Sequence, residues 1–123
     1  MAKAAPKRGG TIEVTKAKAE KGTVEAAGKF QEAKGFQTVM DSFNIRLDPI
    51  TFLGNPDPSR KSIAGNGIVS VFGTWDGVLS GVPSGRWRIV VEITFESTTN
   101  AKDKRTSTAT KNITVPATKI TAP

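Results

Sequence analysis

The chain has 123 residues, a net charge of +7, 12 Gly and 7 Pro, and it contains no Cys, His or Tyr. This length suits a single domain with its own core, while the missing side chains exclude disulfides, thiolate or imidazole metal ligands and the commonest catalytic bases. No apolar run reaches the length of a membrane helix, so we expect a non-enzymatic protein with no metal, no cofactor and no membrane insertion.

The chain begins with a basic stretch, residues 1–10, which is expected to form a flexible arm and lacks the apolar run of a signal peptide. Residues 11–15 and 22–30 alternate between apolar and polar side chains, a pattern that predicts two strands. The segment 15–21 between them is rich in Lys, Ala and Glu, and a helical turn there is an alternative to strand. The segment is too short to hold a helix on its own.

The middle of the chain alternates short apolar runs with turn residues. Residues 36–40 form an apolar patch, and 43–47 alternate as a strand that Pro49 ends. Gly, Pro and Asn mark 54–67 as an exposed irregular loop. The β-branched run 68–73 predicts another strand, followed by a loop over 74–86.

The clearest strand covers residues 87–96, because every second side chain from Trp87 to Phe95 is large and apolar. A polar connection at 97–104 leads to a Thr-rich strand at 105–115, in which Ile113 and Val115 are candidate core residues. About seven short strands without a convincing helix predict an all-β antiparallel sandwich over 11–116, with flexible basic termini at 1–10 and 117–123. A small closed barrel is the alternative.

Two stretches resemble a known family. The order Trp75-Asp76-Gly77, then Val82-Pro83-Ser84-Gly85-Arg86-Trp87, resembles the penultimate loop and strand of bacterial Ig-like domains, in particular the FlgD-type module, and Asn112-Ile113-Thr114-Val115 resembles their last strand. The resemblance implies an Ig-like sandwich in which Trp75 belongs to a turn. Both tryptophans are expected to pack in or at the edge of the core, and an exposed Trp75 that binds a ligand is the alternative.

The sequence supports three functional hypotheses. The first is a structural protein of a virus particle, a bacteriophage capsid decoration (cement) protein made in the host cytoplasm, with the major capsid protein or another virion subunit as partner and homo-oligomers also open. The second is an adhesive or glycan-binding Ig-like module that uses loops 54–67 and 74–86. The third, a non-specific nucleic-acid binder, is disfavoured because no aromatic residues are interleaved with the basic ones.

Basic residues near the two ends are the candidate partner-binding residues, because positive charge suits an acidic protein surface. No catalytic, cofactor-binding or metal-binding residues are predicted. The candidates are Lys3, Lys7, Arg8, Lys102, Lys104 and Arg105.

Overall fold

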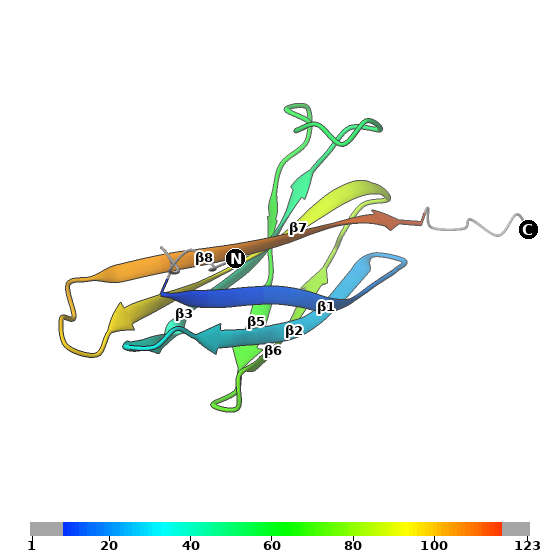
Figure 1. Cartoon of the computed structure of the whole chain (residues 1–123). Helices are drawn as coiled ribbons and strands as arrows, with labels where there is room; N and C mark the ends of the chain where they lie inside the picture. The colour runs from blue at the N-terminus through cyan, green and yellow to red at the C-terminus, as the bar shows by residue number, and fades with distance from the viewer. Residues whose placement is uncertain (1–8, 117–123) are drawn as a thin grey trace, which may run out of the picture.

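A computed structural model describes residues 9–116, and every regular element in that range is a β-strand (Figure 1). The strands in chain order are β1 (Gly10–Glu20), β2 (Thr23–Glu32), β3 (Phe36–Pro49), β4 (Ile63–Ala64), β5 (Asn66–Val69), β6 (Thr74–Ser80), β7 (Gly85–Ser97) and β8 (Lys104–Val115).

The strands form two antiparallel sheets of four, with the orders β1-β2-β6-β5 and β4-β3-β7-β8. Lettered along the chain as A, B, C, C′, D, E, F and G, these orders read A-B-E-D and C′-C-F-G, the arrangement of an immunoglobulin-type sandwich. The predicted antiparallel sandwich is therefore confirmed, with eight strands where about seven were predicted.

The two sheets are joined at both sides of the sandwich. On one side the chain crosses from sheet to sheet at Gly65, whose amide donates to Ile45 O (2.9 Å), and a side chain at this position would collide with Leu79. On the other side β1 lies beside β8, and the buried Ser107 hydroxyl donates to Gly10 O (2.6 Å). These contacts place the long edges of β1 and β8 against each other.

Both tryptophans lie in the core, as predicted. Each is 1% exposed; Trp75 Nε1 donates to Glu13 O (3.1 Å), and Trp87 Nε1 donates to Pro83 O (3.0 Å). The Trp87 bond runs from the start of β7 to a residue just upstream, which is the contact that a tyrosine makes at the E–F corner of immunoglobulin domains. The alternative prediction, that Trp75 is exposed and binds a ligand, is wrong.

Two predicted elements near the start of the chain differ in the structure. Residues 15–20 belong to β1 and form no helical turn, because the register shifts between Val14 and Lys16 and then lets Ala17 pack on the core. The patch 36–40 and the strand 43–47 form one strand, β3, with a second register shift. Ser42 lies in this irregularity, where its hydroxyl accepts from Thr94 N (2.8 Å).

The region around Trp75 also differs from the prediction. Residues 74–80 form β6 rather than a loop, so Trp75-Asp76-Gly77 is strand and not turn. Its side chains alternate, with Trp75 and Leu79 facing the core and Asp76 facing solvent, as a half-buried strand requires. The strand predicted at 68–73 ends at Val69, and the loop predicted at 54–67 contains β4 and the start of β5.

The predicted basic termini fall largely on residues 1–8 and 117–123, outside the described range. Gly9 and Gly10, at the end of the predicted arm, are buried, and a side chain on either would collide with Phe95. The sandwich therefore includes Gly9 and Gly10.

Candidate protein-contact site

The loop between β3 and β4 carries two exposed apolar side chains at its end, in a turn that we call the loop tip (residues 51–55). Phe52 is 85% exposed and Leu53 is 80% exposed. The turn is closed by three bonds: Thr51 N to Asn55 O (2.7 Å), Gly54 N to Thr51 O (2.8 Å) and Asn55 N to Thr51 Oγ1 (3.1 Å). The two apolar side chains therefore stand on an ordered turn.

Two arginines of β7 fasten the loop tip to the sheet. Arg86 Nη1 donates to Phe52 O (2.6 Å), and Arg88 Nη2 donates to Gly54 O (2.8 Å). Arg88 is itself held by Asn112 of β8, whose Oδ1 accepts from its Nε (3.2 Å). Because two carbonyls of the turn are bound by arginines of β7, the backbone of the tip is fixed while its side chains remain in solvent.

Arg60 holds the base of the same loop. Its Nη2 donates to Ile50 O (2.8 Å) and Arg86 O (2.9 Å), and its guanidinium lies 4.7 Å from the centre of the Trp87 ring. Its Nε pairs with Asp57 Oδ2 (3.0 Å). Hydrogen bonds from Ser59, followed by the Arg60 guanidinium, hold the pKa of Asp57 below its ordinary value.

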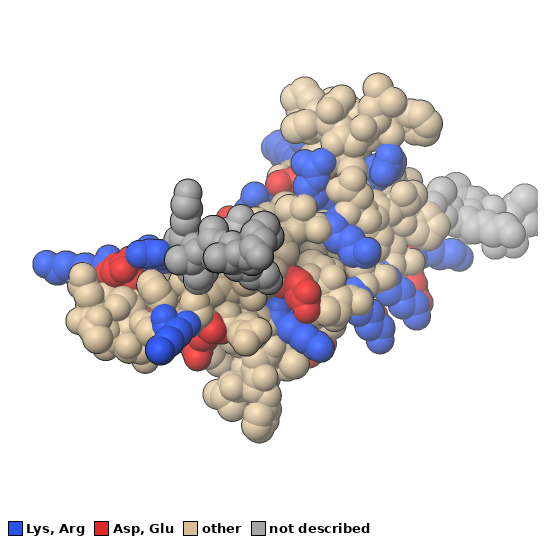
Figure 2. Space-filling view, viewed as in Figure 1, with Lys and Arg blue, Asp and Glu red and all other residues tan. Residues whose placement is uncertain are grey.

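A second apolar tip lies at the opposite end of the sandwich, in the turn between β5 and β6 (the hairpin tip, residues 70–73). Val71 is 83% exposed and Phe72 is 90% exposed. Ser70 closes this turn, since its carbonyl accepts from Gly73 N (3.1 Å) and its hydroxyl from Phe72 N (3.0 Å). Figure 2 shows both protrusions without charged side chains at their ends, and Lys and Arg at the base of the upper one.

A groove of about 430 Å³ lies beside the hairpin tip, and we call it the hairpin groove. Val71, Phe72 and Met40 supply apolar surface, and Glu32 is the charged residue among those that line it. The Glu32 carboxylate is fixed, because its Oε2 accepts from Thr38 N (2.7 Å) and Thr38 Oγ1 (2.8 Å). The groove therefore combines an apolar wall with one oriented negative charge.

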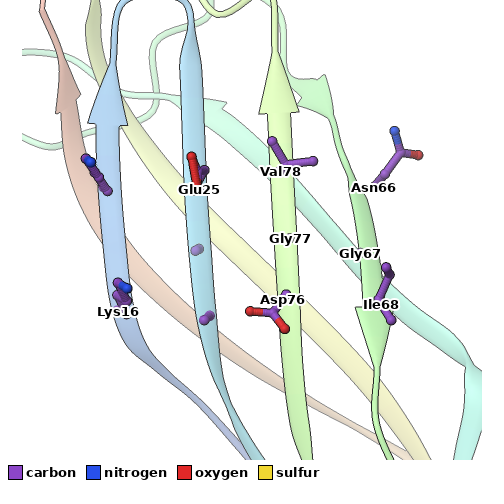
Figure 3. Close-up of a pocket in the computed structure, with 11 residues that line it drawn as sticks. Lys16, Glu25, Asn66, Gly67, Ile68, Asp76, Gly77 and Val78 are labelled. Carbon is purple, nitrogen blue, oxygen red and sulfur yellow. The ribbon is translucent and has the colours of Figure 1, made fainter.

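The outer face of the β1-β2-β6-β5 sheet forms a shallow trough of about 400 Å³ (Figure 3). Lys16, Glu25 and Asp76 project from β1, β2 and β6, and the apolar Val78 and Ile68 lie on β6 and β5. These three charged side chains lie on different strands and do not point toward a common centre. The trough therefore resembles an ordinary solvent-exposed sheet face.

Lys18 lies on the same face and forms an ion pair with Glu20 of the same strand, β1. Its Nζ lies 2.9 Å from Glu20 Oε1, and this hydrogen bond raises the pKa of Lys18. Within residues 9–116, no group of three or more Asp or Glu side chains is placed to hold a metal ion. No helix in the same range is long and apolar enough to cross a membrane.

The predicted partner-binding residues fall in two places. Lys3, Lys7 and Arg8 lie outside the described residues. Lys102 and Lys104 are exposed around the β7–β8 turn, whereas Arg105 is half-buried. Arg105 pairs with Asp103 (3.1 Å) and lies 5.0 Å from the centre of the Phe36 ring, so it also stabilises the fold.

The residues that sequence reasoning missed are those of the two tips. The available signal was the pair Phe52-Leu53, two large apolar residues within a segment otherwise rich in Gly, Pro and polar residues. No pattern linked this turn to Arg86 and Arg88, which lie 34 positions after the Phe52 and Gly54 carbonyls that they bind.

Comparisons with protein-family models, with curated proteins and with solved structures gave no match to this chain.

Proposed function

We propose that this chain is a structural protein that binds other proteins of a larger assembly, namely a capsid decoration (cement) protein of a bacteriophage particle. The observation that supports it best is the loop tip, where two exposed apolar side chains stand on a backbone fixed by arginines. Large exposed apolar groups are unfavourable in water unless a partner covers them, and fixing their backbone in advance lowers the entropy lost on binding.

The arrangement suits a protein that joins neighbours. The loop tip and the hairpin tip lie at opposite ends of the sandwich (Figure 1), so one molecule has a contact surface at each end. The strand edges offer less surface for pairing with a partner, because the edge strands β4 and β5 are short and the edge strands β1 and β8 lie beside each other. The virion assignment itself is supported by the resemblance to bacterial Ig-like modules, which phage particles often carry.

In this proposal the basic ends of the chain supply attraction to an acidic shell. Lys102 and Lys104 are exposed at the β7–β8 turn, and the N-terminal segment 1–8 contributes Lys3, Lys7 and Arg8. Clustered positive charge raises the rate of encounter with an acidic surface and makes binding weaker in salt.

The proposal is tested by density-gradient sedimentation of lysate from host cells that assemble particles and express a tagged chain. We expect the chain to sediment with the major capsid protein. Deletion of residues 2–8, which spares the buried Gly9 and Gly10, is expected to weaken attachment about tenfold, the low end of what electrostatic steering contributes. Replacing Lys3, Lys7 and Arg8 with Gln in the full-length chain is the matched control for lost charge.

A full-length chain that stays among the free proteins at the top of the gradient would contradict the proposal. Retention of DNA by the same chain at about 50 mM salt, without particle association, would favour the nucleic-acid hypothesis.

A further inference from the structure

The two ends of the sandwich differ in shape and charge in a way that makes them complementary. One end presents a knob, the loop tip, and the other presents the hairpin groove. We infer that the loop tip of one copy docks in the hairpin groove of a second copy, so that the chain associates head to tail. This inference rests on the proposed function only in treating the tips as protein-contact surfaces.

Apolar surface is present on both sides of this contact. The knob carries Phe52 and Leu53, and the groove presents Phe72 and Val71 from the hairpin tip with the partly exposed Met40 from β3. Phenylalanine and methionine, which supply three of the side chains in this contact, are enriched at protein interfaces. Each side covers apolar groups that water otherwise surrounds.

The charges around the two surfaces are opposite in sign. Arg60, Arg86 and Arg88 fasten the loop and lie at its base with the exposed Lys61; Asp57 pairs with Arg60 there, and the other three cations leave the base net positive. At the other end, the fixed carboxylate of Glu32 lines the groove, and the exposed Asp41 follows Met40 on β3. Opposite charges at the rim set the orientation of a contact and speed its formation.

The second copy is preferred over a lipid surface because of where the tips lie. They project from opposite ends of one sandwich (Figure 1), so a single bilayer cannot cover both. A contact between different surfaces of identical molecules is heterologous, and it extends into a row unless the geometry closes a ring. Head-to-tail association therefore covers both tips of every molecule except the two at the ends of the row.

The test uses two variants that each lose one end. The knob variant is Phe52→Ser with Leu53→Ser, and the groove variant is Val71→Ser with Phe72→Ser. All four side chains are largely exposed, so both variants are expected to fold, which circular dichroism and thermal melting check. Sedimentation velocity is measured up to about 1 mM protein, because contacts of small area are weak.

We expect the wild-type sedimentation coefficient to rise with concentration and to fall back in high salt. Each variant alone is expected to remain a monomer. An equimolar mixture of the two is expected to form a dimer and nothing larger, because the intact knob of one variant meets the intact groove of the other.

Three results would overturn the inference. The first is a wild-type chain that stays monomeric at every concentration; the proposed function would still stand if that chain sediments with particles. The second is continued association of either variant alone, which would place the contact elsewhere. The third is binding of the wild-type chain to phosphatidylglycerol vesicles with loss of that binding in the knob variant, which would assign the tip to lipid.

Discussion

Replacing Trp75 with alanine is expected to lower the free energy of unfolding by about 3–5 kcal/mol, the range for aromatic-to-alanine changes in cores. The indole is 1% exposed, its ring centre lies 5.4 Å from that of Phe43, and its Nε1 donates to Glu13 O. The change would leave a cavity between the sheets and a carbonyl without its donor. Chemical denaturation followed by circular dichroism measures the loss.

The matched control is Phe72→Ala, which removes an aromatic ring that is 90% exposed on the neighbouring turn. Its effect on the free energy of unfolding is expected to stay within about 0.5 kcal/mol. Equal losses in the two variants would contradict the placement of Trp75 in the core and Phe72 in solvent.

Replacing Arg60 with methionine is expected to lower the free energy of unfolding by about 2–4 kcal/mol, because two backbone carbonyls lose a charged hydrogen-bond donor. These are the carbonyls of Ile50 and Arg86, at the base of the loop, and the stacking of the guanidinium on Trp87 is lost with them. Arg60→Lys is expected to recover only part of the loss, since an ammonium group cannot bind both carbonyls and stack on a ring in the same geometry.

Lys61→Met is the control for Arg60→Met, because Lys61 is the adjacent cation and is exposed. It is expected to leave the denaturation midpoint close to that of the wild type. If Arg60→Met behaved like Lys61→Met, Arg60 would not be what holds the loop.

The sequence predicted the sandwich and its two tryptophans well, because alternation is a local signal. In β7 every second residue from Trp87 to Phe95 is buried, as the pattern required. The prediction was wrong at β6, because Gly77 and the neighbouring Asp76 are residue types that indicate a turn. The structure places Gly77 there because Ile45 of the facing sheet leaves no room for a side chain, a constraint that only the fold reveals.

The strand predicted at 68–73 was wrong beyond Val69, because here the residue types favour a strand and the structure has a turn. Val71 and Phe72 have strand propensity, but the bonds to Ser70 and the positive φ of Gly73 close a tight turn beneath them. Local propensity was overridden by turn chemistry, and two apolar side chains were left in solvent.

The candidate site was the least predictable part, because it depends on contacts between distant segments. The basic residues proposed from the sequence follow from charge alone, and three of them lie outside the described range. The loop tip instead depends on Arg86 and Arg88 reaching back to a turn formed long before them in the chain. Charge at these positions is visible in the sequence, but the carbonyls that these arginines bind are not.

The fixed backbone of the loop tip is the feature on which both proposals depend, and backbone ¹⁵N relaxation by NMR tests it most directly. We predict order parameters of about 0.85 for residues 51–55, the value of a rigid backbone and of the neighbouring strand β7. In a variant with Arg86→Met and Arg88→Met, which loses the bonds to the Phe52 and Gly54 carbonyls, these values should fall toward those of a mobile loop. Order parameters below about 0.6 for the tip in the wild-type chain would contradict the account.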